Sequence, residues 1–508
     1  MKINLLGDSE FGKTPLLSRN LVNCYLRKSG DEITAHPIPG IDFVGPNLFP
    51  VEADVNRLTF QAAFDDMQTN SRIDTRHLTM VVGNRRRIID LTDYAVLVDS
   101  PNFIGESNMG LCTTIVGATN FLLLQGDTGY YSGGAVVSAN FPAAAKFGAY
   151  LDGRYIVNDN SVRGKFQISA IDDPSTWAAL DFATENKYPD KVTGIKAVGQ
   201  YLVIFGTNSI TYWYNTQNPD FPFERNENIV LKVGCSFSGS IAELKETKTL
   251  FFIGNSEDST PKIYALADGK LDIISTPTLE EDLFDSEFAY TKSSTAYEFE
   301  NPYAISRDVS AYCLGIPGTF LYVLNIPHKN KTYYYDVVSK YWGQLKTPEG
   351  NMWPFKQALN MGGRMFLFAD GYQKLMEMKI SSGAFLGDPM LREIETKDIK
   401  LEYPGRHNYV EITTETGTSS SDNLISLEAS NDYGRTWGSR AYRTLKNLGE
   451  YVDRVRWPQL GRTPTRRYRI TYSGSNRFVL KSIYTEVKLS RRTEFDPQKL
   501  AGIEDGAV

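Results

Sequence analysis

The sequence contains few residues of the types that build disulfide frameworks or metal centres. Among its 508 residues it has four cysteines and four histidines. The cysteines (Cys24, Cys112, Cys235 and Cys313) lie far apart, and no two of them form a C-x-x-C pair. We therefore expect no disulfide framework, which favours a reducing compartment. The histidines (His36, His77, His328 and His407) have no second His or Cys at ligand spacing, so we expect no metal and no cofactor.

Long hydrophobic runs and an excess of positive charge are also absent. No window approaches the roughly 18 apolar residues of a membrane helix, which predicts no membrane insertion. The first ten residues include Asp8 and Glu10 and lack the apolar segment of a secretory signal. The formal net charge of −6 argues against a general nucleic-acid coat, which needs clustered Lys and Arg. This net charge is compatible with a protein that surrounds DNA without binding it tightly.

Aromatic residues and glycines are abundant: 29 Tyr, 27 Phe and 41 Gly. This composition favours pleated sheets with many turns. Apolar strands separated by Gly, Asn, Asp or Pro turns recur at intervals of roughly 35–70 residues, close to the length of a four-stranded propeller blade. We predict a mainly β protein with an irregular β-propeller at 56–395. The alternative is a twisted domain of several sheets. The clearest hairpin strands are 78–82, 85–91, 121–124, 249–253, 262–267, 320–326, 332–337, 364–368 and 373–378.

The region 151–214 is the densest part of this pattern. Strands are predicted at 154–158, at 165–170 and at 201–214, the last with a turn at 206–208. Between the second and third strands we predict a polar loop that holds Trp177, Asp181 and Glu185.

Two segments flank the predicted propeller. Residues 1–55 contain five prolines and read as an extended N-terminal arm, with a possible short helix at 16–26. Residues 396–490 are predicted to form a β-sandwich-like domain, and 491–508 a polar tail. The sandwich strands are expected at 407–413, 424–430, 452–457, 467–472 and 478–489.

Charge is distributed unevenly along the chain. Residues 435–492 contain 15 Lys or Arg and three acids, a net of +12, whereas the rest has 39 bases and 57 acids, a net of −18. Such asymmetry predicts a surface that docks on an acidic partner, and a solvated face is the alternative. The candidate subunit or adaptor interface consists of Arg454, Arg456, Arg462, Arg466, Arg467 and Arg469.

The segment Gly7–Thr14 matches the P-loop pattern G-x-x-x-x-G-K-T. Asp8 and Glu10 would place carboxylates where phosphate must bind, and Pro15 follows where the helix should begin. The flanking hairpins also lack the alternation of strands and helices that a parallel nucleotide-binding sheet requires. We interpret the match as coincidental.

The segment Ser430–Trp437 resembles the Asp-box of sialidases, S-x-D-x-G-x-T-W. In sialidases the box is a structural hairpin turn. Here Asp432 would cap the backbone, Gly434 would supply a positive φ, and Trp437 would pack beneath the turn. One copy cannot provide the acid and nucleophile that a glycosidase needs. Neighbouring acids such as Asp65–Asp66 lie on predicted turns, and no G-x-S-x-G elbow is present. We predict no catalytic residue and no enzyme.

Several segments at both ends and in the middle of the chain carry a resemblance to a known family: Asn20–Tyr25, Pro39–Ile41, Asp152–Val157, Phe166–Ser169, Leu180–Glu185, Pro189–Asp190, Leu202–Gly206, Ile210–Tyr214, Gly449–Tyr451, Arg454–Trp457, Leu460–Arg462 and Arg467–Ile470. The most recognisable signature is Trp177, Asp181, Glu185 and Asp190. In these segments the chain resembles the packaged-DNA stabilisation protein family of tailed phages, which forms the tail hub or nozzle of short-tailed phages.

This resemblance implies a non-enzymatic virion tail protein that is assembled in the bacterial host cytoplasm. It implies a homo-hexameric ring below the portal and its adaptor ring, which prolongs the DNA channel and retains the packaged genome. The implied partners are the portal-adaptor ring, a tail fibre or tailspike, a needle or plug, and DNA that passes without sequence-specific binding. The alternative is a sialidase-like or glycan-binding propeller of the tail.

Overall fold

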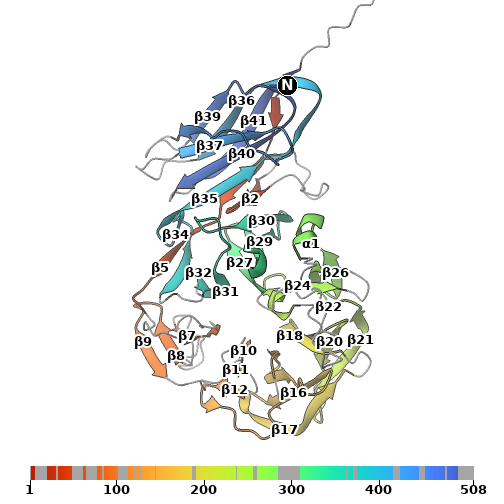
Figure 1. Cartoon of the computed structure of the whole chain (residues 1–508). Helices are drawn as coiled ribbons and strands as arrows, with labels where there is room; N and C mark the ends of the chain where they lie inside the picture. The colour runs from red at the N-terminus through yellow and green to blue at the C-terminus, as the bar shows by residue number, and fades with distance from the viewer. Residues whose placement is uncertain are drawn as a thin grey trace, which may run out of the picture. The chain divides into compact units, whose positions relative to one another are not determined.

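The computed structural model describes the chain as two compact units (Figure 1). One unit, here called the propeller, comprises Pro39–Met390. The other, here called the sandwich, comprises Met1–Ile38 together with Leu391–Val508. The residues described are 2–5, 20–29, 32–47, 61–64, 77–82, 85–100, 113–117, 120–125, 128–142, 145–185, 190–235, 237–255, 260–283, 309–361, 363–369, 372, 374–415, 424–445, 452–474 and 478–489.

The propeller begins with four antiparallel sheets of four strands each, in which every strand pairs with the next along the chain. Sheet 1 is β6 (Gln61–Phe64), β7 (His77–Val82), β8 (Arg85–Asp90) and β9 (Val96–Ser100). Sheet 2 is β10 (Thr113–Val116), β11 (Phe121–Gln125), β12 (Thr128–Tyr131) and β13 (Gly134–Ala135). Sheet 3 is β14 (Gly148–Leu151), β15 (Arg154–Asn158), β16 (Lys165–Ala170) and β17 (Asp173–Thr184). Sheet 4 is β18 (Val192–Val198), β19 (Tyr201–Gly206), β20 (Ile210–Asn215) and β21 (Phe223–Leu231).

Three further sheets follow within the described residues. Sheet 5 is β22 (Gly234–Cys235), β23 (Ala242–Leu244), β24 (Thr249–Asn255), β25 (Lys262–Ala267) and β26 (Lys270–Ile273). Sheet 6 is β27 (Ser310–Ile316), β28 (Thr319–Ile326), β29 (Lys331–Asp336) and β30 (Tyr341–Leu345). Sheet 7 is β31 (Phe355–Met361), β32 (Arg364–Ala369), β33 (Leu375–Lys379) and β5 (Gly40–Val44). The short strand β34 (Ala384–Phe385) runs parallel to β5.

A strand from the start of the chain closes the ring of sheets. β5 pairs with β33 from Gly40 opposite Lys379 to Val44 opposite Leu375. Its side chains join one apolar cluster with Leu78 and Ile89 of sheet 1, so the last sheet packs on the first (Figure 1). Gly40 is needed there, because a Cβ atom would lie 2.7 Å from the Ala384 carbonyl oxygen. The predicted β-propeller is therefore confirmed.

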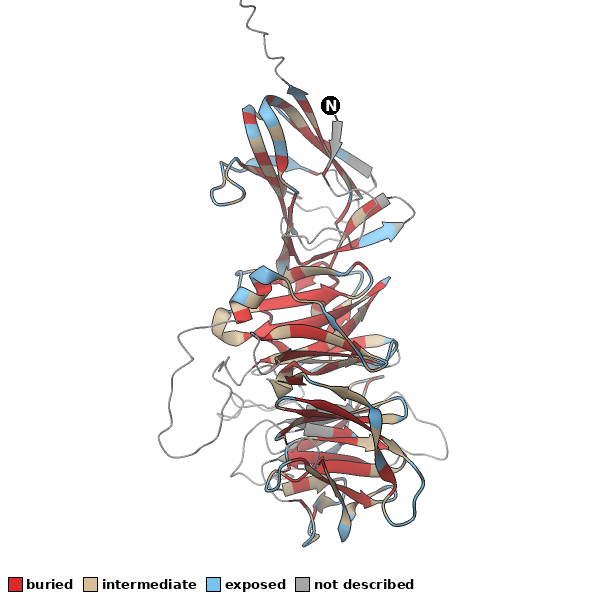
Figure 2. Ribbon diagram, turned by 90° about the vertical axis from the view of Figure 1, so that its right-hand side faces the viewer, coloured by how far each residue is buried: buried red, intermediate tan, exposed pale blue. Residues whose placement is uncertain are grey.

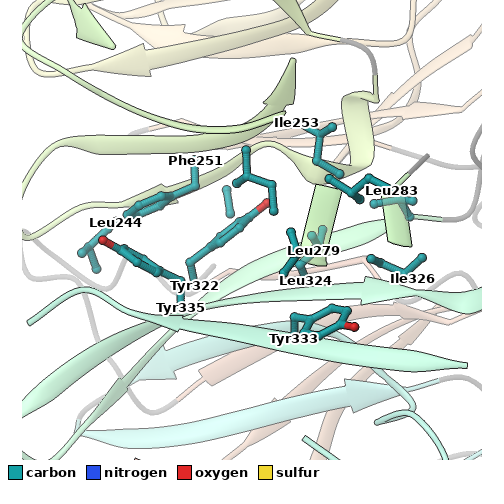
Figure 3. Packing of buried hydrophobic residues seen from close by; sticks show 13 residues of the cluster. Leu244, Phe251, Ile253, Leu279, Leu283, Tyr322, Leu324, Ile326, Tyr333 and Tyr335 are labelled. Atoms are coloured by element: carbon teal, nitrogen blue, oxygen red, sulfur yellow. The ribbon is translucent and has the colours of Figure 1, made fainter. Parts of the chain in front are cut away.

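Apolar clusters between successive sheets form the propeller core. The inner strands are continuous apolar runs, as in β28, because both faces of such a sheet are covered by its neighbours. Figure 2 shows these strands buried along most of their length and exposed mainly at their turns. Between sheets 5 and 6, Phe251 stacks on Tyr322 with ring centroids 5.0 Å apart (Figure 3). The helix α1 (Pro277–Leu283) adds Leu279 and Leu283 to the same cluster.

The polar loop predicted around Trp177 is wrong. Trp177 and Asp181 lie on β17, and Glu185 follows its last residue. β17 is the last strand of sheet 3, with β16 as its partner, and most of its side chains are exposed or half-buried, in keeping with its polar composition. The pairing register shifts at Ser169, so two bulges interrupt the alternation from which a strand could be recognised. Trp177 is 3% exposed and Leu180 is 83% exposed, so the strand has one covered and one open side.

The sandwich combines both ends of the chain. One layer is β39–β36–β41, to which β1 and β4 add from the N-terminal segment. The other is β38–β37–β40, extended by β35 and β2. The strands are β1 (Lys2–Asn4), β2 (Leu21–Val22), β3 (Cys24–Ser29), β4 (Glu32–Pro37), β35 (Asp388–Glu395), β36 (Ile399–Glu415), β37 (Leu424–Ser430), β38 (Ala441–Thr444), β39 (Val452–Pro458), β40 (Arg462–Gly474) and β41 (Val479–Leu489).

The N-terminal segment, predicted as an extended arm, contributes strands to both units. Residues up to Ile38 belong to the sandwich, and residues from Pro39 belong to the propeller. The helix predicted at 16–26 is wrong over its described part, because Leu21–Val22 and Cys24–Ser29 are strands. The hairpin β3–β4 supplies the backbone partners, with Tyr25 opposite His36. The predicted tail at 491–508 lies outside the described residues.

Candidate functional site

Arg454 and Arg456 lie on the outward side of β39 and share one carboxylate. Glu411 is the direct cross-strand partner of Arg456, and residues two apart on a strand point to the same face. Arg454 Nη2 lies 2.5 Å from Glu411 Oε1, and Arg456 Nε donates to Oε2 at 2.8 Å. The arginine side chains are 65% and 51% exposed, whereas that of Glu411 is 4% exposed. The two guanidinium groups therefore remain accessible on an open surface while they share a buried carboxylate.

The same contacts fix the charge states. Burial opposes ionisation of Glu411, but hydrogen bonds from Arg454 and Arg456 outweigh it, so the pKa of Glu411 is lowered. The hydrogen bond to Glu411 raises the pKa of Arg456. The Arg456 guanidinium also lies 4.2 Å from the centroid of the Tyr409 ring, a cation–π distance. Glu411 and Arg456 are thus both ionised at neutral pH, and these contacts hold the two side chains in a defined position.

Arg467 and Arg469 lie on the opposite layer, within an internal charge network. Arg467 binds Asp398 through two hydrogen bonds of 2.8 and 3.0 Å. Arg469 donates to Glu395 at 2.7 Å, and its guanidinium lies 3.8 Å from the centroid of the Trp437 ring. The two arginine side chains are 13% and 21% exposed. Their charges serve the sandwich itself and leave little for a partner.

The remaining two candidates differ from each other. Arg466 is buried, and it donates to the Leu460 carbonyl oxygen at 2.8 Å. Arg462 is exposed, and its Nε donates to the Pro404 carbonyl oxygen at 3.1 Å. The structure therefore does not bring the six arginines together in one patch. An interface role stays a prediction for Arg454, Arg456 and Arg462.

The Asp-box forms a tight hydrogen-bonded turn after β37. Asp432 Oδ1 accepts from the Thr436 backbone N–H at 2.9 Å and from the Ser430 hydroxyl at 2.7 Å. The Thr436 hydroxyl, which donates to Oδ2, is the main cause that lowers the pKa of Asp432. Gly434 has a φ of 88° and lies against Arg467 and Trp437. The hydrogen bonds of Ser430, Asp432 and Thr436 lie within the turn, which is a structural arrangement.

Trp177 lies between sheets 2 and 3. Its indole N–H donates to the Pro174 carbonyl oxygen at 2.8 Å, and its ring meets Phe141 edge-on with centroids 5.2 Å apart. It belongs to a cluster with Leu122 and Leu124 of sheet 2 and Val157 of sheet 3. The signature tryptophan therefore joins two neighbouring sheets.

The other signature residues fix nearby segments. Glu185, which is buried, accepts from Arg225 of β21 at 2.7 Å and so joins sheet 3 to sheet 4. Asp190 accepts from the Asn208 backbone N–H at 3.0 Å and the Ser209 hydroxyl at 2.9 Å, which caps the β19–β20 turn. Asp181 is half-buried on β17, apart from both of these contacts.

Cys24, Cys235 and His407 are buried, and Cys313 is half-buried. Burial raises the pKa values of Cys24, Cys235 and Cys313 to about 12, so their thiolates are disfavoured. Burial, with the nearby Arg466 charge, lowers the pKa of His407 to about 4. The described residues contain no group of three His, Cys, Asp or Glu placed to hold a metal ion. The P-loop match lies outside the described residues.

Sequence reasoning missed a pocket on sheet 4. Its volume is about 620 Å³, and its lining includes Tyr201, Tyr214, Asn226 and Asn228. The available signal was the run Glu224–Asn228, five polar residues inside an otherwise predicted β region. Periodicity cannot distinguish such a run from a loop.

Two sequence models of protein families match the chain. Residues 115–370 match the model described as bacteriophage P22 Gp10, β-propeller, and residues 392–488 match its β-sandwich model. The first match lies within the propeller, and the second lies within the sandwich. The chain belongs to the bacteriophage P22 Gp10 family. It is therefore a phage structural protein of the kind that stabilises packaged DNA, as the sequence resemblance predicted.

Other comparisons add little to the Gp10 assignment. No curated protein matches the chain. Among solved structures, Hsv2 of Kluyveromyces lactis is 8% identical, with a TM-score of 0.31, over 64% of this chain and 95% of that one. The exo-β-1,3-galactanase of Phanerochaete chrysosporium is 8% identical, with a TM-score of 0.25, over 96% of this chain and 100% of that one. No helix in the described ranges is long and apolar enough to span a membrane.

Proposed function

We propose that this Gp10-family protein forms the hub or nozzle ring of a short phage tail. The observation that carries the proposal is the pair of family matches at 115–370 and 392–488, one within each structural unit. The ring would consist of identical copies, six as the resemblance implies. It would lie below the portal-adaptor ring, prolong the DNA channel and retain the packaged genome without any catalytic turnover.

The charge distribution supports head-to-tail contacts between copies. Identical subunits close a ring when one surface meets a different surface of the next copy. Outside residues 435–492 the chain has a net charge of −18, and the sandwich exposes Arg454, Arg456 and Arg462. Opposite charges on the two surfaces would steer and orient such contacts. We propose the exposed arginines as part of a subunit or adaptor interface.

A net-negative body also suits a channel for DNA. Like charge repels the phosphate backbone, so DNA would pass without adhering. The outer turns of the propeller would give a tail fibre or tailspike, and a distal needle or plug, surfaces for attachment. In this role the protein acts in the virion tail after assembly in the host cytoplasm.

Genome retention tests the proposal. Filled heads that lack this protein should lose their DNA to nuclease, and the purified chain should restore protection. The measurement is the nuclease-resistant DNA per head before and after addition. Unchanged leakage with the folded protein present would contradict a role in genome retention.

A charge variant tests the arginine surface. Reversing Arg454 and Arg456 would also leave the buried Glu411 carboxylate among like charges, which would destabilise the sandwich. The triple variant R454Q/R456Q/E411Q removes the exposed charge and its buried partner together. We expect it to weaken binding to the adaptor complex or to other copies while the melting temperature changes little. The single variant E411Q, which keeps both arginines, is the control, and equal binding by both variants would exclude an interface role.

A further inference from the structure

The pocket on sheet 4 is built by an irregularity in the outer strand. Thr211 of β20 pairs with Val230, but Trp213 pairs with Arg225, so four residues of β21 bulge out between these two pairs. The bulge is held by Asn226, whose Oδ1 accepts from the Asn228 backbone N–H at 3.0 Å. Bulges of this kind redirect side chains at sheet edges. Here they direct Asn226, Glu227 and Asn228 toward the pocket.

Two tyrosines supply its aromatic wall. Tyr201 and Tyr214 are direct cross-strand partners, so they lie on the same face of sheet 4, and both line the pocket. The Tyr201 ring meets Tyr212 edge-on, with centroids 5.8 Å apart, which fixes its orientation. A tyrosine offers an apolar ring face together with a hydroxyl group.

The charged groups of the pocket are largely engaged with one another. Arg225 binds Glu185 at 2.7 Å and also binds Glu227. Asp152, from the β14–β15 turn, accepts from the Asn215 amide at 3.1 Å. Acids outnumber bases in the lining, which disfavours phosphate or another anion. The polar lining equally disfavours a lipid or another apolar ligand.

The groups that remain for a ligand are amides, a carboxylate and phenols. Gln200, Asn226 and Asn228 can each donate and accept, Glu224 can accept, and the tyrosine hydroxyls can do both. Hydroxyl groups of a sugar need the same mixture of donors and acceptors, and the face of its ring is apolar. The cavity of about 620 Å³ lies within the usual range of small-ligand pockets.

We propose that this pocket binds a neutral carbohydrate. The sugar ring packs against Tyr201 and Tyr214, and its hydroxyl groups bond to Gln200, Asn226, Asn228 and Glu224. This binding site does not depend on the ring role proposed above, because it lies within one propeller and uses none of the exposed arginines.

Screening of the full-length protein on an array of neutral and acidic oligosaccharides tests this proposal, followed by saturation-transfer NMR with the bound glycans. We expect at least one neutral oligosaccharide to bind with a Kd of about 1 mM or tighter. The variant N226A/N228A should weaken that binding at least tenfold, and E224Q, which alters only an exposed side chain, should weaken it measurably. Y442A, at an exposed tyrosine of β38, should leave it unchanged.

Three results would overturn the proposal. The first is that no neutral oligosaccharide binds. The second is that a neutral oligosaccharide still binds equally well to both N226A/N228A and E224Q. The third is that the protein binds hexalysine and no glycan, and that E224Q/E227Q abolishes the binding of hexalysine. The last result would assign the pocket to a cationic partner. Thermal unfolding of each variant confirms that it is folded, and these outcomes are independent of genome retention.

Discussion

The propeller and the sandwich are held together by different interactions. In the propeller, buried aromatic and aliphatic side chains fill the space between successive sheets, as Phe251 and Tyr322 do. The sandwich has an apolar core as well, but its outward faces also carry arginine–carboxylate networks, such as Arg467 with Asp398 and Arg456 with Glu411. Covered sheet faces are filled mainly by apolar side chains, with ion pairs such as Arg225–Glu185 among them, whereas a face open to solvent can accommodate more paired charges.

This difference changes the meaning of the basic segment 435–492. Its arginines face acids that precede it in the chain: Glu393, Glu395, Asp398, Glu411 and Glu428. Much of the asymmetry in sequence is therefore balanced inside the folded sandwich. Of the six candidate arginines, Arg454, Arg456 and Arg462 are the ones exposed to a partner.

Disruption of the N-terminal segment should have the largest effect, because that segment contributes strands to both units. Deletion of residues 1–45 removes β5 from sheet 7 and β1–β4 from the sandwich. We expect both units to lose cooperative thermal unfolding, as measured by calorimetry. The variant I41D places a charge at a buried position of β5. It should lower the free energy of unfolding of the propeller by more than about 4 kcal/mol and so abolish only the propeller transition. Two intact transitions after the deletion would contradict the shared role of this segment.

Substitution of one tryptophan in each unit compares the propeller with the sandwich directly. W177A should lower the free energy of unfolding by about 3–5 kcal/mol, because it leaves a cavity between sheets 2 and 3. W437A removes a half-buried ring that stacks on Arg469, worth about 1 kcal/mol. Denaturant unfolding of purified variants measures both. Equal losses would mean that the apolar contact between sheets is not the dominant contribution.

The sandwich should show a pH dependence that arises from His407. This residue is fully buried, and its Nδ1 lies 3.0 Å from the Tyr468 hydroxyl. Its pKa is about 4 in the folded chain and about 6.5 when unfolded. As the pH falls from 6.5 to 4, the unfolded chain takes up a proton that the folded chain does not, so stability falls by about 3 kcal/mol. Below pH 4 this contribution changes no further.

Stability curves of the sandwich transition between pH 7 and pH 5 check this prediction. The variant H407Q cannot titrate in this range and should have a flatter profile than the natural chain. Carboxylates such as Glu411, whose pKa is lowered, lose their stabilising effect only at lower pH. Identical slopes for both proteins between pH 6.5 and 5 would exclude His407 as the source.

Loss of one charge from the network should have a smaller effect than the loss of Trp177. R467M leaves Asp398 without its guanidinium partner, whereas Glu395 keeps Arg469, and the substitution should lower the free energy of unfolding by about 1–3 kcal/mol. The double variant R467M/D398N should recover part of that loss. No recovery would indicate that Arg467 acts through packing against its neighbours and not through its charge.

Much of the fold could be predicted from local patterns. The strands expected at 154–158 and 165–170 are β15 and β16, because apolar alternation and turn residues are local signals. β17 was missed because its bulges and open edge break that alternation. The split of the N-terminal segment depends on pairings with residues more than 300 positions away, such as Asn23 with Leu391, which leave no local trace.

The candidate site was predicted less well for the same reason. Arg454 and Arg456 alternate with the buried Val455 and Trp457 on β39, whereas Arg467 and Arg469 on β40 are half-buried. Their partners lie far away in sequence: Glu411 is 45 residues from Arg456, and Asp398 is 69 residues from Arg467. The sequence alone could not show which arginines are already paired.

Electron microscopy of the chain purified with its portal-adaptor complex tests the proposed hub most directly. We expect a closed ring of six copies of the 57.0 kDa chain coaxial with the adaptor. The R454Q/R456Q/E411Q variant should form fewer such rings than E411Q at the same concentration. A chain that stays strictly monomeric and does not bind the adaptor complex would contradict the proposal.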